Sequence, residues 1–368
     1  MKKVMLVFGT RPEAIKMCPL VNELKKRKSI NTIVCVTGQH RQMLDMVLQA
    51  FCINPDYDLS IMKEKQTLFD VTTNILNRIK EVLEIEKPDV VLVHGDTSTT
   101  FVTALACFYM QIAVGHIEAG LRTYNIYSPF PEEFNRQAVS IISTFNFAPT
   151  ELSKMNLLKE GKKPDSIFVT GNTAIDALKT TVKSDYSHPE LEWAKGSRLI
   201  MITAHRRENL GEPMRHMFKA IRRVMDEHTD VKAIYPIHMN PVVREIADEF
   251  LGGDDRIHII EPLDVLDFHN FLNHSYLILT DSGGIQEEAP SLGKPVLVMR
   301  DTTERPEGIK AGTLKLVGTT EENIYKEFSS LLSNSVEYEK MSKASNPYGD
   351  GTACKKIADI LEIELSKN

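Results

Sequence analysis

Short apolar runs alternate along this chain with longer segments whose apolar residues recur at helical spacing. The run VMLVF (4–8) is apolar at every position, and the segment 13–28 that follows has the periodicity of a helix. Strands that are apolar on both faces and alternate with helices are typical of a buried parallel sheet. We therefore predict an α/β protein with doubly wound sheets. The apolar runs are VMLVF (4–8), TIVCV (32–36), DVVLVH (89–94), QIAVGHI (111–117), SIFVT (166–170), RLIMIT (198–203), VKAIYPI (231–237), RIHIIE (256–261), SYLILT (275–280) and KPVLVM (294–299).

The pattern is interrupted once, by a polar segment at 171–197 that contains a proline and has weaker periodicity. A length of 368 residues also favours about two domains. We predict a Rossmann-like domain over 1–170 and a second one over 171–368, with a C-terminal helix that packs on either of them. Two such sheets in one chain usually bind their ligand in a cleft, at the carboxyl ends of the strands.

The charge and the cysteine content exclude several classes of protein. A net charge of −6 argues against a surface that neutralises a nucleic-acid backbone. Five cysteines, without a CxxC spacing, indicate reduced thiols rather than a disulfide framework. No apolar stretch reaches the roughly 18 residues of a membrane span, and the apolar start of the chain is too short for a signal peptide. We expect a cytoplasmic protein that binds neither membrane nor nucleic acid.

In the first half, charged residues follow the predicted strands. Arg11 and Lys16 come after the first strand, near a helix N-terminus that favours anions. Asp96, Glu118 and Glu132 follow later strands, and carboxylates gathered at one rim shift one another's pKa, as general acids and bases require. Four of these residues also have an ordinary interpretation: exposed loop charges for Arg11 and Lys16, a helix cap for Asp96, and a first-turn acid for Glu132.

In the second half, His205 and Arg206 follow the strand RLIMIT, and His238 follows VKAIYPI. A buried structural histidine is the alternative in both places. The histidines are scattered and show no metal-ligand spacing, so we predict no tightly bound catalytic metal.

The segment TDSGGIQEEAPSLGKP (280–295) predicts a nucleotide site. Ser282, Gly283 and Gly284 follow a strand and open a helix, so their backbone N–H groups can approach a phosphate. Glu288 lies one helical turn further on, where a carboxylate can accept hydrogen bonds from ribose hydroxyls. Arg305 adds a charged donor for the diphosphate. These residues together indicate a nucleoside diphosphate.

Seven segments together resemble one family over nearly the whole chain. The segments are FGTRPEAIKMCPL, VHGDTSTT, GHIEAGLRT, PEEFNRQ, TAHRREN, TDSGGIQEEAPSLGKPV and RDTTERPEG. They are similar to segments of the bacterial non-hydrolysing UDP-N-acetylglucosamine 2-epimerases, in particular those of Gram-positive bacteria. The resemblance implies two Rossmann-like domains of the glycosyltransferase-B type, a homodimer, and an isomerase that inverts C2 of the sugar without NAD or metal. Its product, UDP-N-acetylmannosamine, supplies teichoic acids and capsules.

The resemblance also implies roles for individual residues. Positions that bind UDP in the family are matched by Arg11, Ser282, Gly283, Gly284, Glu288 and Arg305. Phe268 matches a position that contacts uracil. Lys16, Asp96, Glu118, Glu132 and His205 match active-site positions, without any indication of which acid is the general base.

Some Gram-positive relatives bind a second UDP-N-acetylglucosamine as an activator. The matching positions are Gln39, Gln42, Glu132, Arg206 and His238. The alternative for Gln39 and Gln42 is a polar loop that enters a helix. The relatives carry arginine where this chain has Lys65, which keeps the charge but loses bidentate geometry.

Three other functions share these features. A UDP-sugar-dependent glycosyltransferase has the same fold and nucleotide site, a hydrolysing epimerase releases free N-acetylmannosamine, and a UDP-sugar-binding regulator has no reaction. The acid cluster argues against the regulator, because a pure binder gains nothing from carboxylates near a diphosphate.

Overall fold

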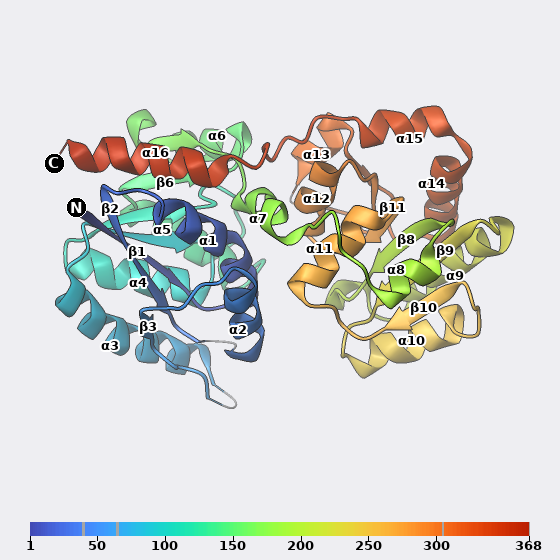
Figure 1. Cartoon of the computed structure of the whole chain (residues 1–368), viewed down its shortest axis with the longest axis horizontal. Helices are drawn as coiled ribbons and strands as arrows, with labels where there is room; N and C mark the ends of the chain where they lie inside the picture. The colour runs from blue at the N-terminus through green and yellow to red at the C-terminus, as the bar shows by residue number, and fades with distance from the viewer. Residues whose placement is uncertain (39–40, 64–65, 304, 368) are drawn as a thin grey trace. The chain divides into compact units, whose positions relative to one another are not determined.

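The computed structural model describes residues 1–38, 41–63, 66–303 and 305–367, and it divides into two compact units. Unit 1 comprises Met1–Thr180 and Tyr348–Asn368, and unit 2 comprises Thr181–Pro347 (Figure 1). The sequence-based division after residue 170 assigned 171–180 to the second domain and left open which domain the C-terminal helix packs on. Both segments belong to unit 1.

Unit 1 is built on a seven-stranded sheet with the order β3-β2-β1-β4-β5-β6-β7, in which every neighbouring pair is parallel. The order reverses between β1 and β4, so the loops after these two strands adjoin. The elements of unit 1 are β1 (Lys2–Phe8), α1 (Arg11–Leu24), β2 (Ile30–Val36), α2 (Arg41–Ala50), β3 (Tyr57–Asp58), α3 (Leu68–Glu86), β4 (Val90–His94), α4 (Ser98–Tyr109), β5 (Ala113–Ile117), α5 (Glu132–Ile142), β6 (Phe145–Ala148), α6 (Glu151–Lys159), η1 (Pro164–Ser166), β7 (Ile167–Val169), α7 (Thr173–Thr181) and α16 (Ala353–Ser366).

Unit 2 contains a six-stranded parallel sheet with the order β10-β9-β8-β11-β12-β13. Here the order reverses between β8 and β11. The elements of unit 2 are α8 (Pro189–Ala194), β8 (Arg198–Thr203), η2 (Arg207–Asn209), α9 (Glu212–Glu227), β9 (Val231–Pro236), α10 (Pro241–Leu251), β10 (Ile257–Ile260), α11 (Val265–His274), β11 (Leu277–Thr280), α12 (Ile285–Glu288), η3 (Ala289–Leu292), β12 (Val296–Val298), α13 (Pro306–Ala311), β13 (Leu314–Leu316), α14 (Glu321–Ser333) and α15 (Ser335–Ser342).

The predicted α/β class with two doubly wound parallel sheets is confirmed. All ten apolar runs contain strands, whereas β3, β6 and β13 were not predicted. These three strands are two to four residues long, and their sequences YD, FNFA and LKL lack β-branched residues. They are held by pairing with a longer neighbour rather than by their own β-propensity.

Both faces of each sheet are covered, which explains the apolar runs. In β8, Ile200 and Ile202 join one buried cluster, which includes side chains of α9. Leu199 and Met201 join a second cluster with side chains of α11. Successive residues of a strand point to opposite faces, so a strand covered on both faces is apolar at every position.

The C-terminal helix α16 is anchored within unit 1. The Asp176 carboxylate of α7 accepts hydrogen bonds from the backbone N–H groups of Ala353 and Cys354, at 3.1 and 3.0 Å. Further along, Arg27, which follows the end of α1, forms an ion pair with Glu362 at 2.9 Å. Asp176 thus acts on the start of α16 as a helix cap does, although it lies far away in sequence.

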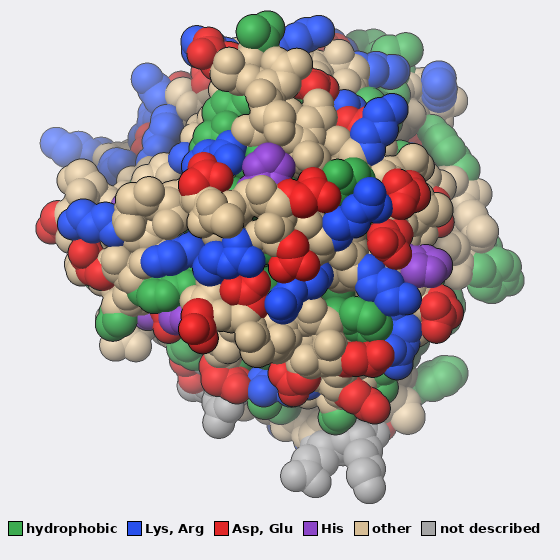
Figure 2. All heavy atoms as spheres, turned by 90° about the vertical axis from the view of Figure 1, so that its right-hand side faces the viewer, with side chains coloured by type: hydrophobic (Ala, Val, Ile, Leu, Met, Phe, Trp, Pro, Cys, Tyr) green, Lys and Arg blue, Asp and Glu red, His purple; other side chains and the backbone are tan. Residues whose placement is uncertain are grey.

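Within the described residues, no helix has the length and apolarity needed to cross a bilayer. On the face in Figure 2, basic and acidic side chains are interspersed.

Candidate functional site

The turn between β1 and α1 is organised by Glu13. Thr10 is the N-cap of α1, and the Glu13 carboxylate accepts hydrogen bonds from the backbone N–H groups of Gly9 and Thr10, at 3.0 and 2.8 Å. Its other oxygen accepts from the hydroxyls of Thr97 and Thr100, at 2.6 and 3.2 Å. Glu13 therefore links the loop after β1 to the loop after β4, and burial raises its pKa.

Gly9 is required because the side chains of Thr37 and Thr99 lie close to its Cα, and not because the chain makes a tight turn there. A Cβ at this position would lie 1.9 Å from Thr37 Oγ1 and 2.7 Å from Thr99 Oγ1, and these two hydroxyls are hydrogen-bonded to each other at 3.0 Å. Only glycine fits beneath this pair.

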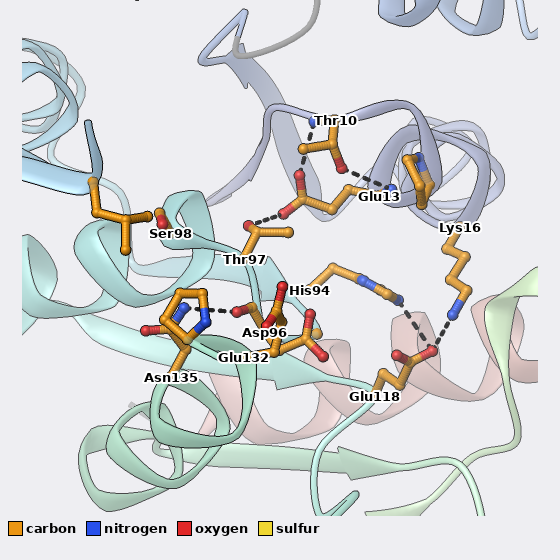
Figure 3. Close-up of a pocket in the computed structure, with 14 residues that line it drawn as sticks. Thr10, Glu13, Lys16, His94, Asp96, Thr97, Ser98, Glu118, Glu132 and Asn135 are labelled. Carbon is orange, nitrogen blue, oxygen red and sulfur yellow. Dashed lines mark hydrogen bonds and ion pairs between the residues drawn. The ribbon is translucent and has the colours of Figure 1, made fainter. Parts of the chain in front are cut away.

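A pocket of about 510 Å³ opens at the carboxyl ends of β1, β4 and β5 (Figure 3). Four of the five residues predicted to form the active site line it, whereas the fifth, His205, lies in unit 2. The lining residues are Thr10, Pro12, Glu13, Lys16, Leu68, His94, Gly95, Asp96, Thr97, Ser98, Glu118, Pro131, Glu132 and Asn135.

Glu118 is surrounded by nitrogen atoms. Its Oε2 atom forms an ion pair with Lys16 and lies 3.7 Å from His94 Nε2 (Figure 3). The same oxygen accepts a hydrogen bond from Asn172 Nδ2 at 3.3 Å. The backbone of Glu118 has φ +64°, a conformation that is uncommon for a non-glycine residue. A non-glycine residue held in this conformation, next to a pocket, is typical of functional positions.

His94 was not predicted as a site residue. It is buried, and burial lowers its pKa to about 3, so the ring is neutral at physiological pH. Its Nε2 atom has no hydrogen-bond partner among the described residues. The sequence signal that could have identified His94 was a polar residue directly after the apolar residues VVLV (90–93).

Asp96 is not the cap of α4, because Thr97 caps this helix through Thr100 N at 3.2 Å. The Asp96 carboxylate instead forms an ion pair with Arg136 Nη2 at 2.5 Å, while its backbone carbonyl accepts from Asn135 Nδ2 at 2.8 Å. Burial raises the pKa of Asp96, although Arg136 opposes the shift. The family segment PEEFNRQ contained Arg136, but its role was not predicted.

The adjacent acids Glu132 and Glu133 have different surroundings. Glu133 is buried and accepts hydrogen bonds from the backbone N–H groups of Thr123 and Tyr124, each at 3.0 Å. It therefore holds the preceding loop in place. Glu132, the first residue of α5, lines the pocket instead.

In unit 2, the predicted nucleotide residues lie at the carboxyl end of β11, beside the end of β8. The helix after Ser282-Gly283-Gly284 is short, since α12 covers only Ile285–Glu288 before a 3₁₀ turn. Gly284 has helical dihedral angles, and a Cβ on it would lie 3.8 Å from Glu288 Oε1. The Glu288 carboxylate thus lies beside Gly284, as the spacing predicts.

Two neighbouring glutamates in this segment are held by different partners. Arg305 Nε donates to Glu287 Oε1 at 2.7 Å, so this part of the guanidinium faces a buried acid. Glu288 lies 3.7 Å from His269 Nε2, and the other ring nitrogen of His269 is 2.7 Å from Thr181 Oγ1. The sequence did not predict His269.

Two further residues that were predicted to bind UDP lie elsewhere. Phe268 lies half-buried on α11, beside His269. Arg11 is the first residue of α1 in unit 1.

His205 and His238 lie together at the carboxyl ends of β8 and β9, with their rings stacked at a centroid distance of 5.4 Å and an interplanar angle of 12°. Both are exposed, so neither is a buried core histidine. Arg206 Nη1 forms an ion pair with Glu208 at 3.2 Å.

Other predicted residues of the second site are not described. Gln39 and Lys65 lie outside the described residues, and Gln42 belongs to α2, where its side chain is not described. In the parts of the chain that are described, no group of three His, Cys, Asp or Glu side chains is arranged to hold a metal ion.

Comparison with known proteins agrees with the resemblance. A family model described as UDP-N-acetylglucosamine 2-epimerase matches residues 22–362. A Bacillus subtilis UDP-N-acetylglucosamine 2-epimerase is 66% identical over 359 residues, which are 98% of this chain and 94% of the relative.

Two crystal structures are also similar. The UDP-GlcNAc 2-epimerase of Neisseria meningitidis, bound to UDP-GlcNAc, has a TM-score of 0.90 and 51% identity, over 98% of this chain and 100% of that one. The enzyme of Methanocaldococcus jannaschii, in complex with UDP-GlcNAc and UDP, has a TM-score of 0.80 and 35% identity, over 98% and 99% of the two chains. With the strand-end acids and the segment around Gly284 in place, these matches show that the chain belongs to the UDP-N-acetylglucosamine 2-epimerase family.

Proposed function

We propose that this chain catalyses the reversible epimerisation of UDP-N-acetylglucosamine to UDP-N-acetylmannosamine, without NAD or metal. The observation that carries the proposal is the shared pocket of Asp96, Glu118 and Glu132, with Lys16 paired to one of these acids. Carboxyl groups in different surroundings, such as Glu118 beside Lys16 and Asp96 beside Arg136, are suited to removing a proton and returning it. Family membership supports the choice of substrate.

The proposed reaction proceeds by elimination and re-addition. A carboxylate removes the proton from C2, the bond between C1 and the UDP oxygen breaks, and its electron pair leaves with UDP. A double bond forms between C1 and C2, giving 2-acetamidoglucal. UDP then adds back at C1 while a protonated acid delivers a proton to the opposite face of C2. The sum is an isomerisation that needs no oxidant.

In this mechanism the two units have separate tasks. Asp96, Glu118 and Glu132 of unit 1 handle the C2 proton. The UDP part is bound by Arg11 of unit 1 and by six residues of unit 2, which are Phe268, Ser282, Gly283, Gly284, Glu288 and Arg305. Backbone N–H groups and guanidinium groups stabilise the departing diphosphate.

The decisive test is incubation of the protein with UDP-N-acetylglucosamine in D2O, followed by NMR. Both epimers should acquire deuterium at C2 while the sugar remains attached to UDP. A glycosyltransferase would leave the C2–H bond intact, and a hydrolysing epimerase would release the free sugar. A binding protein without activity would change nothing.

We also propose that the product supplies N-acetylmannosamine units for teichoic acid or another cell-surface polysaccharide, and that the protein acts in the cytoplasm. Cys18, Cys35, Cys107 and Cys354 are buried free thiols, and Cys52 is an exposed one. Free thiols of this kind suit a reducing compartment.

We further propose that the protein is a homodimer, joined through an apolar stripe on α4 and α5. Phe101 and Phe108 are seven residues apart on α4, and Phe134 and Ile141 are seven apart on α5, so each pair shares one face of its helix. The rings of Phe101 and Phe134 meet at a centroid distance of 5.5 Å. Phe108 is 57% exposed and Ile141 is 73% exposed. Exposed apolar patches of this kind often mark an interface.

Light scattering tests the dimer. The wild type should have twice the mass of one chain, and the double variant Phe108→Lys/Ile141→Lys should be monomeric. Val336→Lys, at an exposed position of α15, is the matched control and should leave the mass unchanged. A monomeric wild type would contradict the proposal.

A further inference from the structure

The loops after β8 and β11 meet at the point where the strand order of unit 2 reverses. Asp281 directly follows β11 and is fully buried. Its Oδ2 atom accepts hydrogen bonds from the backbone N–H groups of His205 and Arg206, each at 2.9 Å, and from Asn209 Nδ2 at 3.1 Å. This oxygen fixes the backbone of the loop that carries His205.

The second carboxylate oxygen of Asp281 has a different environment. Asp281 Oδ1 is buried and accepts no hydrogen bond among the described residues. It lies 3.5 Å from His205 Nδ1. A buried carboxylate oxygen without a donor is unfavourable, so a proton on the nearby Nδ1 is stabilised.

We propose that Asp281 is a positioning residue, which holds the His205 loop and keeps the proton of the neutral His205 ring on Nδ1. The ring nitrogen that remains for a ligand is then Nε2, which accepts a hydrogen bond when the ring is neutral and donates one when it is protonated. That His205 takes part in the reaction rests on the proposed function, whereas its tautomer does not.

The stacked partner ring has the opposite tautomer. His238 Nδ1 accepts a hydrogen bond from the backbone N–H of Asn240 at 3.1 Å. A neutral ring that accepts at Nδ1 carries its proton on Nε2. His205 and His238 therefore form a stacked pair in which the two neutral rings differ in the position of the proton.

The charge of Asp281 also bears on the protonation of His205. Desolvation of the partly exposed ring lowers the pKa of His205, and His238 and Arg206 act in the same direction, while Asp281 opposes them. Replacing Asp281 with a neutral residue should therefore lower the pKa of His205 further.

Nitrogen NMR of the full-length protein, labelled with ¹⁵N-histidine, measures the tautomers without any substrate. We expect a protonated Nδ1 and an unprotonated Nε2 for neutral His205, and the reverse for His238. The variants His205→Gln and His238→Gln assign the signals. A neutral His205 with its proton on Nε2 would overturn the proposal, even if no other variant folds.

Two matched variants separate the effect of the charge from that of loop anchoring. Asp281→Asn removes the charge but keeps an oxygen acceptor, and it should lose the preference for Nδ1–H at His205. Tyr235→Phe removes the hydrogen bond from the Tyr235 hydroxyl to Ala204 O, at 2.5 Å, which anchors the same loop without a charge. It should leave the tautomer of His205 as it is in the wild type. An unchanged tautomer in a folded Asp281→Asn variant would contradict the proposal.

If the proposed function is also correct, Asp281→Asn should shift the limb of the pH profile of kcat that reports His205 to lower pH, with little change in KM. Tyr235→Phe should not shift it. Failure of C2 exchange in D2O together with the expected tautomers would reject the proposed function and leave the role of Asp281 standing. C2 exchange as expected, together with a His205 proton on Nε2, would support the proposed function and reject the role of Asp281.

Discussion

At the scale of single residues, the carboxyl groups of the unit 1 pocket differ in their partners. Glu118 has Lys16 and Asn172 as donors, whereas Asp96 has Arg136. Glu133, the direct neighbour of Glu132, is bonded to the backbone of a loop. Neighbours in sequence therefore differ in surroundings, since Glu132 lines the pocket and Glu133 does not.

The first prediction concerns three of the acids that line the pocket. Replacement of Asp96, Glu118 or Glu132 by its amide should lower kcat by about 10²–10⁴-fold, because a general acid or base contributes that much. Affinity for UDP, measured by calorimetry, should remain nearly unchanged. Glu151→Gln, at an exposed first-turn acid of α6, is the control. Normal turnover in a variant that lacks all three acids would show that they are structural.

The second prediction concerns Glu288. If its carboxylate binds the ribose, Glu288→Ala should weaken UDP binding by about 1.5–3 kcal/mol, as expected for a charged hydrogen bond. Glu245→Ala, at an exposed position of α10, should have no effect. Calorimetry with UDP distinguishes the two, and equal affinities would place the ribose elsewhere.

At the scale of elements, strand β5 contains a buried histidine, His116, whose Nε2 lies 2.7 Å from Gly95 O. Burial lowers its pKa to about 4. In the unfolded chain this histidine has a pKa near 6.5 and is protonated below that pH, whereas the buried ring stays neutral. The free energy of unfolding therefore falls as the pH drops from 6.5 toward 4.

The third prediction follows from this shift. His116→Gln keeps an N–H donor for Gly95 but does not titrate. Between pH 7.5 and pH 5 the variant should lose about 2 kcal/mol less unfolding free energy than the wild type does. Urea unfolding at both pH values is the measurement, and His216→Gln, at a half-buried residue of α9, is the control. Equal losses in variant and wild type would exclude a neutral, buried His116.

The fourth prediction concerns helix α16. Thr352, at its N-cap position, makes no side-chain cap hydrogen bond, and the carboxylate of Asp176 takes this role. Asp176→Ala should cost about 1–2 kcal/mol of stability, as the loss of a helix cap does. Hydrogen exchange should accelerate in the first turn of α16. Asp350→Ala removes a carboxylate bonded to Thr352 just before the helix and should have a smaller effect. Equal exchange in both variants would contradict the role of Asp176.

At the scale of the whole molecule, the chain passes from unit 1 to unit 2 after Thr180 and returns before Tyr348. The proposed machinery is divided accordingly, with the acids in unit 1 and most of the nucleotide residues in unit 2. The positions that match the second UDP-sugar site are divided as well, since Glu132 belongs to unit 1 and Arg206 to unit 2. We propose that a second UDP-N-acetylglucosamine that binds at these positions stabilises the active conformation of the protein, as allosteric activation requires.

The fifth prediction tests this activation. In the reverse reaction, starting from pure UDP-N-acetylmannosamine, progress should show a lag that disappears when a trace of UDP-N-acetylglucosamine is added. With Lys65 replaced by arginine the activation should become stronger, because the guanidinium restores bidentate contacts. Linear progress from the start, with and without the trace, would exclude the second site.

The sequence alone determined the class of fold. Ten apolar runs located ten strands, because a strand buried on both faces is apolar throughout. It also located the strand ends, and therefore Asp96, Glu118 and Ser282, since loops after parallel strands come at predictable places in the chain. It did not predict β3, β6 and β13, whose stability comes from their neighbours.

Only the tertiary structure decided which residues meet. His94 and Asn172 approach Glu118 from elsewhere in the chain, and Asp281 reaches His205 because β8 and β11 are neighbours in the sheet. Arg305 faces Glu287, and α16 joins unit 1 through Asp176. Such contacts depend on strand order and side-chain direction, which local periodicity does not encode, because it reports only which face of an element is buried.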